Sequence, residues 1–297
     1  MDEELLADGL GWAEGPTVLA DGRICFVETY RSQVSVWQRG GGVRRYAYTA
    51  GGPNSCVLGE AGVLYVCQNG GTTGPWRAEE MVTPSIQRIA VEGGRAEIVA
   101  TELDGRAFNG PNDLVFGRDG RLYFTDPGTY RPESPEPSCL FVLEADGSGR
   151  LLAELDPPTF PNGIAIEADG SVVWAESYTG MVRRLRLESG AMEDIAKLPG
   201  EHPIADGMAV AADGRLYVTT VNGGGIDVIS PDGEFECHIK AGSVPTNCVF
   251  DGRDLIMTDA GISADSADAS YGGRLWRLPI DVEGLPTSYG HIKTRKV

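Results

Sequence analysis

The chain has 297 residues and a formal net charge of −18, which argues against nucleic acid or an anionic membrane surface as a partner because both require basic patches. Its 41 glycines and 18 prolines are typical of many short strands joined by turns rather than of a helical protein. No stretch approaches the roughly 18–20 consecutive apolar residues of a membrane-spanning helix. The acidic N-terminus carries no secretory signal and the six scattered cysteines form no Cys-x-x-Cys pair, so we expect a reduced, cytoplasmic protein.

Six similar stretches follow one another along the chain, each with a polar residue, an apolar run, a turn and a second apolar run. The third, from Asn112 to Asp126, has the turn Asp119-Gly120 at its centre. Apolar runs on either side of an Asp-Gly pair predict a β-hairpin. The six hairpins begin at positions that are 40, 58, 50, 44 and 41 residues apart, namely Glu14, Asn54, Asn112, Asn162, Asp206 and Asn247.

This spacing predicts the architecture. A repeat of about 40–50 residues with four strands in each unit is the signature of a β-propeller. Further strand-like runs, such as Gln33 to Gln38 and Met181 to Leu187, supply the outer strands. We therefore predict an all-β, six-bladed β-propeller that forms a single domain over residues 1–297. Because the tail after Arg274 offers only one or two further strands, the run Glu4 to Leu10 is expected to complete the last blade and close the ring.

The first strand of each blade lines the central channel of a propeller, so the six hairpin-starting residues are expected to point toward one axis. Each is a carboxylate or a carboxamide. Oxygen ligands of this kind suit a hard divalent cation such as Ca²⁺, which takes about six to eight oxygens. Glu14 and Asp206 would balance its charge, and Asn112 and Asn162 would add neutral carbonyls. The absence of His and Cys from the ring argues against Zn²⁺, although the sequence leaves Mn²⁺, Zn²⁺ and Mg²⁺ open.

A simpler interpretation of the six residues is that they cap strands and hydrogen-bond to their neighbours, as Asn and Asp do at turns. Six such residues at equivalent places favour the metal site over this alternative. Asn54 and Asn247 are equally suited to ligating a metal, to spacing the ring and to holding water. Asp113, the next residue along its strand from Asn112, is expected to point away from the axis.

The loops that follow the second strands should form the rim of the same cavity. Two of them are long, Asn69 to Pro84 and Pro127 to Ser138, and long loops in compact domains are either functional lids or disordered. We favour a partial lid. The candidate substrate contacts are Asn54 in the ring and three residues around the third hairpin, namely Asn109, Asp126 and Tyr130.

The chain resembles the SMP-30/gluconolactonase/luciferin-regenerating-enzyme family of six-bladed propellers. The motifs that carry the resemblance are Glu14-Gly-Pro, Asn109-Gly-Pro-Asn-Asp113, Phe124-Thr-Asp-Pro127, Phe160-Pro-Asn-Gly-Ile164 and Ala205-Asp-Gly-Met208. The resemblance implies a central divalent metal, usually calcium, held by Glu14, Asn112, Asn162 and Asp206. It also implies hydrolysis of lactones, typically sugar lactones. Sugar lactonases of the family often place Arg or Lys two residues before the central Asn, where this chain has Gly110.

The resulting hypothesis is a hydrolase that opens a small cyclic ester, with the metal as a Lewis acid at the carbonyl. Asp206 is the candidate general base, and water bound directly to the metal is the alternative source of the nucleophile. Glu14 is expected to be a ligand only. His202, four residues before Asp206, is either a surface residue or a proton shuttle near the channel mouth. No Gly-x-Ser-x-Gly nucleophile motif is present.

Two other functions remain open at this point. The same metal could serve a hydrolase that acts on a phosphotriester or a cyclic diketone, because one propeller scaffold hosts unrelated activities. The protein could also be a non-catalytic, metal-stabilised propeller that binds a small molecule. In each case the expected partner is a small molecule, and the sequence leaves the oligomeric state open.

Overall fold

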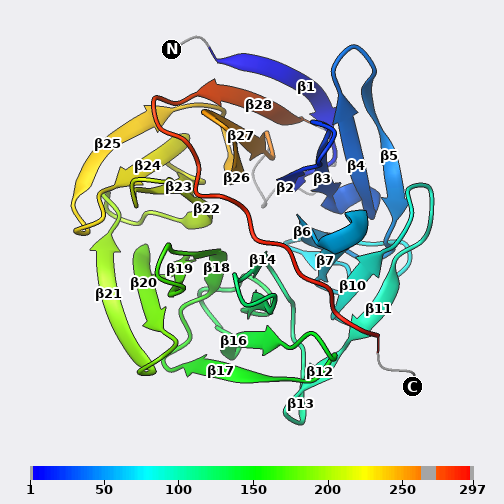
Figure 1. The fold of residues 1–297 in the computed structure, drawn as a ribbon, viewed down its shortest axis with the longest axis horizontal. Helices are drawn as coiled ribbons and strands as arrows, with labels where there is room; N and C mark the ends of the chain where they lie inside the picture. The colour runs from blue at the N-terminus through cyan, green and yellow to red at the C-terminus, as the bar shows by residue number, and fades with distance from the viewer. Residues whose placement is uncertain (1–2, 262–271, 295–297) are drawn as a thin grey trace.

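The computed structural model describes residues 3–261 and 272–294, and six four-stranded sheets surround a central axis in it (Figure 1). The fold is the predicted six-bladed propeller. The only helices in these two ranges are the 3-10 turns η1 (Thr29–Arg31) and η2 (Glu60–Gly62). None of the helices described there has the length and apolar content needed to cross a membrane.

The blades follow the chain. Blade 1 consists of β2 (Ala13–Val18), β3 (Ile24–Glu28), β4 (Gln33–Gln38) and β5 (Gly42–Tyr48). Blade 2 consists of β6 (Pro53–Leu58), β7 (Leu64–Gln68), β10 (Ser85–Ile89) and β11 (Glu97–Ala100). Blade 3 consists of β14 (Leu114–Phe116), β15 (Leu122–Asp126), β16 (Ser138–Leu143) and β17 (Gly149–Leu155).

The second half of the ring repeats the arrangement. Blade 4 consists of β18 (Pro161–Ile166), β19 (Val172–Glu176), β20 (Met181–Arg186) and β21 (Ala191–Lys197). Blade 5 consists of β22 (Ala205–Val210), β23 (Leu216–Thr220), β24 (Gly225–Ile229) and β25 (Phe235–Lys240). Blade 6 consists of β26 (Pro245–Asp251), β27 (Asp254–Asp259), β28 (Gly273–Pro279) and β1 (Glu4–Leu10).

The ring closes through the N-terminal strand, as predicted. β1 pairs antiparallel with β28, with Glu4 opposite Arg277 and Leu10 opposite Gly273. The outermost strand of blade 6 therefore comes from the start of the chain, and the two ends of the fold are joined within one sheet. This arrangement removes the open junction between first and last blades that a purely sequential ring would leave.

Apolar side chains between neighbouring blades hold the ring together. Between blades 2 and 3, Tyr65 packs edge-on against Phe116 with ring centroids 5.3 Å apart, and both residues are almost fully buried. Phe124 and Phe141 stack nearby at 5.4 Å. Such aromatic contacts add about 0.5–1.5 kcal/mol each to the burial of their surface. The core is thus a series of interfaces between blades, which fixes the inner strands around the axis.

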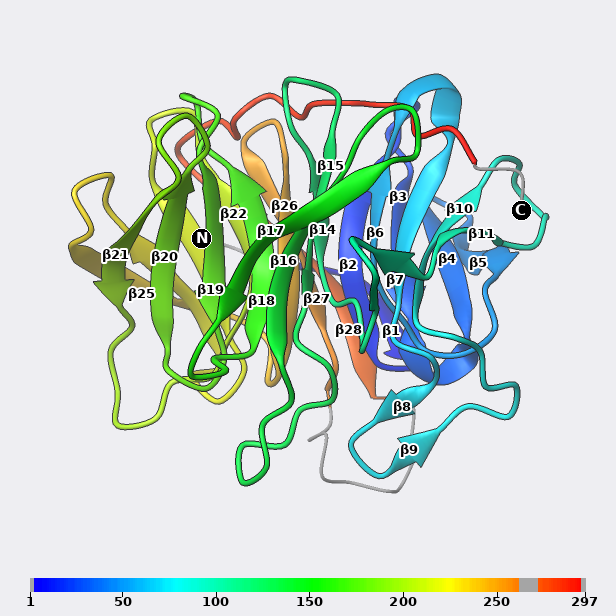
Figure 2. The same ribbon diagram turned by 90° about the horizontal axis from the view of Figure 1, so that it is seen from below.

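The two faces of the disc differ (Figure 2). The loop after β15 and the small hairpin of β8 (Thr72–Thr73) and β9 (Trp76–Arg77) extend from one face. A second small hairpin, β12 (Glu102–Leu103) with β13 (Arg106–Ala107), lies in the long connection between blades 2 and 3.

The C-terminal tail crosses the opposite face, over the centre of the ring in Figure 1. It hydrogen-bonds to blade 5 through Leu285 N and Val210 O at 2.9 Å. It also bonds to blade 2, where Glu60 N donates to Gly290 O at 2.8 Å. The tail therefore bridges distant blades at the far mouth of the channel.

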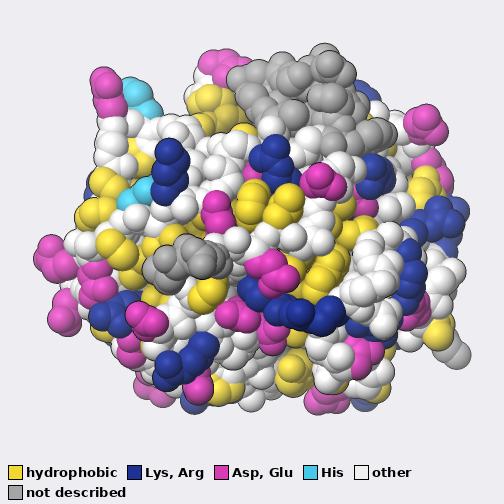
Figure 3. All heavy atoms as spheres, turned by 90° about the horizontal axis from the view of Figure 1, so that it is seen from above, with side chains coloured by type: hydrophobic (Ala, Val, Ile, Leu, Met, Phe, Trp, Pro, Cys, Tyr) yellow, Lys and Arg dark blue, Asp and Glu magenta, His cyan; other side chains and the backbone are white. Residues whose placement is uncertain are grey.

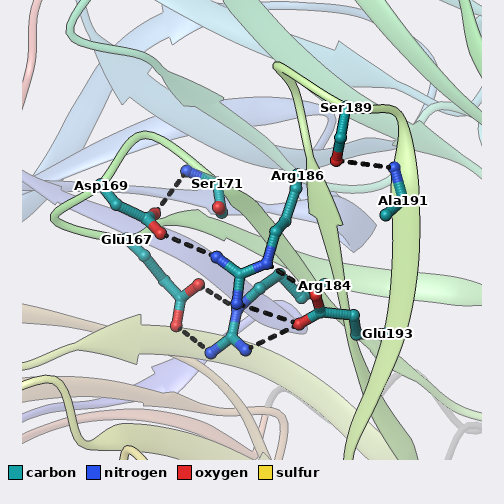
Figure 4. A network of polar contacts seen from close by, with 8 residues as sticks. All are labelled: Glu167, Asp169, Ser171, Arg184, Arg186, Ser189, Ala191 and Glu193. Atoms are coloured by element: carbon teal, nitrogen blue, oxygen red, sulfur yellow. Dashed lines mark hydrogen bonds and ion pairs between the residues drawn. The ribbon is translucent and has the colours of Figure 1, made fainter.

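Asp and Glu lie among Lys and Arg, with apolar side chains between them, on the side of the disc that Figure 3 shows. Blade 4 carries a network of such pairs (Figure 4). Arg184 bonds to Glu167 and to Glu193, and Arg186 bonds to Glu193 at 2.6 Å and to Asp169 at 3.1 Å. Each carboxylate in this network has an arginine partner.

Candidate metal centre and its cavity

A cavity of about 460 Å³ lies on the axis, on the face that carries the long loops. Its volume falls within the range of small-molecule pockets, about 300–1,000 Å³. Among the residues that line it are five of the six predicted ring members, namely Glu14, Asn54, Asn112, Asn162 and Asp206. The structure thus brings together all four residues that we predicted as metal ligands.

A bulge at the start of the inner strands aims these side chains at the axis. In blade 4, Pro161 pairs with Glu176, but the next pair is Ile164 with Trp174, so the register shifts between them. Blade 5 has the same shift between Ala205 and Met208. A β-bulge inserts an extra residue and reorients the strand locally. Asn162 and Asp206 occupy these shifted positions, each as the second residue of its strand.

Asn247 does not belong to this layer. The second residue of β26 is Thr246, whose hydroxyl donates to Ala13 O at 2.8 Å. Asn247 is the third residue, and it lines a separate cavity on the opposite side of the ring. The alignment of hairpins by their polar residues was therefore wrong by one position in blade 6, where the shortened turn hid the register.

The expectation that Asp113 points away from the axis was also wrong. Asp113 is buried and lines the second cavity beside Asn247. Its carboxylate accepts hydrogen bonds from Leu114 N at 2.9 Å and from Ile164 N in the next blade at 3.1 Å. Regular pairing in blade 3 begins only at Leu114, so the alternation of side chains along a strand does not apply to the two residues before it, and Asn112 and Asp113 both face the channel. The inner ring contains a third carboxylate that we had not counted.

Glycines make room for this second layer. The positions equivalent to Asp113 in blades 4 and 5 are Gly163 and Gly207. A Cβ on Gly207 would overlap the Asn247 side chain, and one on Gly163 would lie 2.6 Å from the Gly207 Cα. The inner strands therefore approach one another more closely than side chains would allow at these positions.

The negative charges on the axis repel one another. Burial, followed by the charge of Asp206, raises the pKa of Glu14 well above its usual range. Burial and then the charge of Asp113 raise the pKa of Asp206 in the same way. Burial also raises the pKa of Asp113. Among the described residues that line the upper cavity there is no Lys, Arg or His, so the carboxylates have no positive side chain to balance them there.

The donor set fits a hard divalent cation. Asn162 Nδ2 donates to Ser177 Oγ at 3.1 Å, but its buried Oδ1 has no hydrogen-bond partner. A buried acceptor without a partner costs about 1–3 kcal/mol, and a cation on the axis would satisfy it. In the described ranges no three His, Cys, Asp or Glu side chains form a metal-ligating group. The two asparagine amides are therefore needed to complete a site with Glu14 and Asp206.

The four candidate substrate contacts separate into two pairs. Asn54 and Tyr130 line the cavity. Asp126 is buried, and it accepts hydrogen bonds from Asn109 N at 2.9 Å and from Gly110 N at 2.6 Å. Burial raises the pKa of Asp126 to about 6. Asp126 and Asn109 lie outside the residues that line the cavity, and their contact anchors the loop that leads to Asn112.

His202 also lies outside the lining of the cavity. It is exposed, and its carbonyl oxygen accepts a hydrogen bond from Asn222 Nδ2 at 2.7 Å. The described arrangement favours the surface interpretation of this histidine over a proton shuttle.

The sequence analysis missed the apolar residues of the cavity wall. Trp12, Phe160, Ile204 and Val244 all line it, and each stands two residues before the second residue of an inner strand. The signal was present in the repeat, because these four positions are equivalent. It was overlooked because only the polar residues of the repeat had been aligned.

These features define a class of protein, a six-bladed β-propeller with a pocket of carboxylates and carboxamides on its axis. Residues 12–261 match the family described as the SMP-30/gluconolactonase/LRE-like region, and the chain belongs to this family.

Individual relatives agree with this assignment. A gluconolactonase from Zymomonas mobilis is 25% identical over 281 residues, which cover 83% of this chain and 75% of the relative. A luciferin-regenerating enzyme structure superposes with a TM-score of 0.78 at 17% identity and covers 98% of this chain and 99% of its own. A calcium-binding regucalcin of Agrobacterium tumefaciens gives a TM-score of 0.74 at 17% identity, covering 99% of this chain and 98% of its own. At such identities the two structures establish the fold alone.

Proposed function

We propose that the protein is a metal-dependent hydrolase that opens a small lactone. The observation that carries the proposal is the pairing of two buried carboxylates with two amides at the floor of a ligand-sized cavity. The family membership and the gluconolactonase relative support lactones as the substrate class. Glu14, Asn112, Asn162 and Asp206 would hold the cation, with Ca²⁺ as the expected ion because all four supply oxygen.

The reaction adds water across the acyl C–O bond of the ring. A bound cation would supply Lewis-acid stabilisation of the oxyanion, worth several kcal/mol. Asp206 Oδ would take the proton of the attacking water, and that proton would pass to the ring oxygen as the C–O bond breaks, giving a hydroxy acid. Asn162, within hydrogen-bonding reach of Asp206, would orient this carboxylate. Glu14 would bind the cation without transferring a proton.

The chain also arranges the approach to this floor. The carboxylate of Asp126 fixes Gly110 by accepting the Gly110 backbone N–H. Gly110 and Pro111 lead directly into Asn112. Ser177 holds Asn162 by accepting from its amide, while its own hydroxyl donates to Ala205 O at 2.6 Å. The Ser177 contact leaves the Asn162 carbonyl oxygen without a partner, and the Asp126 contact fixes the backbone that leads to Asn112, so both contacts position the amides before any ligand binds, which is the general requirement for electrostatic preorganisation.

The test is a pH-indicator assay of the purified protein with Ca²⁺ against sugar lactones, aliphatic lactones, cyclic diketones and paraoxon. We expect lactone hydrolysis that EDTA abolishes and that Asp206→Asn lowers by at least about a thousandfold, equivalent to about 4 kcal/mol. Asp169→Asn, on the outer face of blade 4, serves as the matched control and should keep full activity. Full activity of Asp206→Asn or of the chelated protein would refute the proposal.

A further inference from the structure

Four apolar side chains from adjacent blades form an arc around the cavity above the carboxylate layer, and we call them the apolar collar. They are Trp12, Phe160, Ile204 and Val244, from blades 1, 4, 5 and 6. The four residues make the same backbone hydrogen bond within their blades. The carbonyl oxygen of each accepts from the N–H of the residue that follows the second strand of its blade, and these donors are, in the same order, Thr29, Ser177, Val221 and Ala260. The collar is thus built into the repeat and held by the strands of four adjacent blades.

Neighbouring residues extend the collar. Tyr130 packs edge-on against Phe160 with ring centroids 5.1 Å apart, and Val221 lines the cavity beside Ile204. On the opposite side, Trp12 packs against Tyr30 at 5.4 Å, and Tyr30 stacks on Trp76 at 5.0 Å. Aromatic walls therefore face each other across the opening.

Three polar side chains of the cavity wall, Asn69, Ser177 and Asn222, are already bonded within the protein. Asn69 accepts from Gly71 N at 2.9 Å and donates to Thr73 Oγ1 at 3.2 Å. Asn222 accepts from Ile204 N at 2.9 Å and donates to His202 O. Ser177 both donates and accepts within the protein. A sugar ring brings several hydroxyl groups that lose water on entering, and burying each without a partner costs at least about 1 kcal/mol.

Positive charge is also kept away from the cavity. Three arginines occur in the rim loops, but none of them lines it. Arg31 bonds to Glu28 and to Gly9 O, Arg77 bonds to Gly74 O at 2.7 Å, and Arg131 lies 3.8 Å from Glu136. Gly110, two residues before Asn112, adds no charge of its own. An anionic sugar acid or a phosphorylated lactone would therefore meet two carboxylates without a cationic side chain from this wall to offset them.

From these observations we infer that the substrate is an uncharged lactone with an apolar alkyl or aryl substituent, and that the apolar collar determines this specificity. The inference rests on the proposed hydrolase function and specifies its substrate class. The ester ring lies over the carboxylate and amide layer, and the substituent contacts Phe160, Ile204 and Val244. The products are a hydroxy acid and no other species, since water supplies both the hydroxyl group and the proton.

The experiment compares three δ-lactones that share one ring. They are δ-valerolactone without a substituent, δ-decalactone with a pentyl chain and glucono-δ-lactone with hydroxyl groups. The Ca²⁺-loaded protein should give a kcat/KM for δ-decalactone at least about tenfold above that for δ-valerolactone, and glucono-δ-lactone should be the poorest of the three, because a few methylenes in an apolar pocket are worth tenfold or more. Turnover in which glucono-δ-lactone is the best substrate would overturn the substrate class and leave the hydrolase function intact. Absence of turnover of all three would overturn the hydrolase function itself.

An isosteric double variant tests the collar directly. Val221→Thr with Val244→Thr keeps the shape of the wall and adds two hydroxyl groups. We expect about a tenfold lower kcat/KM for δ-decalactone, mainly through KM, with δ-valerolactone changed less than about twofold. Val91→Thr, at an exposed position outside the cavity, is the control and should change neither value.

Binding of an inert lactam separates recognition from chemistry. Calorimetry with 6-pentylpiperidin-2-one, the lactam of the same shape as δ-decalactone, should give binding to the wild type that weakens about tenfold in the double variant. Equal affinity of wild type and double variant would overturn the role of the collar, whatever the activity.

Discussion

Three carboxylates lie on the axis and three lie in the network of blade 4, but the two groups have different partners. On blade 4, Glu167, Asp169 and Glu193 all meet Arg184 or Arg186 (Figure 4). On the axis, Glu14, Asp113 and Asp206 face one another, and the described lining of the upper cavity offers only amides and hydroxyls as polar partners.

The two groups of carboxylates therefore contribute differently to the stability of the fold. The outer pairs are partly solvated and satisfied within the chain, so each contributes little, about 0–1 kcal/mol. The axial carboxylates are buried and left with their charge uncompensated, which a folded chain tolerates only when a cation or a proton supplies the balance. The unsatisfied Asn162 Oδ1 in the same layer favours the cation.

The largest expected effect is cation stabilisation of the fold. Ca²⁺ at about a thousandfold above its Kd should add about 4 kcal/mol to the free energy of unfolding, or about 8 °C in Tm for a chain of this size. Differential scanning calorimetry with and without EDTA measures the shift. Glu14→Gln should abolish most of it, whereas Arg184→Met on blade 4 should keep it. A shift of the same size in both variants would contradict the axial site.

The next effect is a loss of stability with rising pH that comes from Asp126. Burial raises its pKa to about 6, so the folded state keeps a proton that the unfolded chain releases above about pH 4. The folded state then binds more protons, and the free energy of unfolding should fall by about 3 kcal/mol between about pH 4 and pH 6. Urea unfolding of wild type and Asp126→Asn at constant Ca²⁺ isolates this effect as their difference. A difference that does not vary with pH, or that varies with the opposite sign, would be inconsistent with it.

A smaller effect is expected from a methyl group in the second layer of the axis. Gly163→Ala would bring a Cβ to 2.6 Å from the Gly207 Cα, so two inner strands must separate. We expect a loss of about 2 kcal/mol together with weaker Ca²⁺ binding. Gly41→Ala in blade 1 is the matched control, since its Cβ would lie 3.5 Å from the Gln38 Cβ in ordinary contact. Equal costs at the two sites would show that the axis is not closely packed.

The smallest effect is expected on blade 4. Arg184→Met removes a partner from Glu167, and both side chains keep some contact with solvent, with exposed fractions of 15% and 14%. We expect a loss of about 1 kcal/mol that shrinks at high salt, because surface ion pairs are screened. Chemical denaturation at low and high salt measures it. A loss comparable to that of Gly163→Ala would remove the distinction between the two regions.

The sequence was sufficient to predict the blades because each hairpin repeats the same local chemistry. Apolar alternation and Asp-Gly turns depend on residues close together in the chain, and the sequence repeats them at intervals of 40 to 58 residues. The closure by β1 followed from counting strands, and the structure confirms it.

The predictions that were wrong concern side-chain directions that depend on tertiary geometry rather than on the local sequence pattern. Asn247 was misplaced because the register of blade 6 shifts between Pro245 and Asn247. Asp113 was misplaced because it precedes the regular strand, which begins at Leu114. The crossing of the tail over blades 5 and 2 could not be predicted, since residues 281–294 carry no repeat and their contacts are to backbone groups far away in the sequence.

That tail has a consequence for turnover. Leu285 to Ser288 lie against the lower cavity, and the layer of Asp113 and Asn247 separates that cavity from the upper one. Among the described residues, the lining of the upper cavity includes Thr73 and Thr129 of the long rim loops, so in the proposed reaction we expect substrate and product to use the same face of the ring. The hydroxy acid carries a new carboxylate and an apolar chain that suits the collar, so we expect competitive product inhibition that strengthens as the chain lengthens. For the proposed hydrolase we therefore expect the departure of product, rather than ring opening, to set the rate at high conversion.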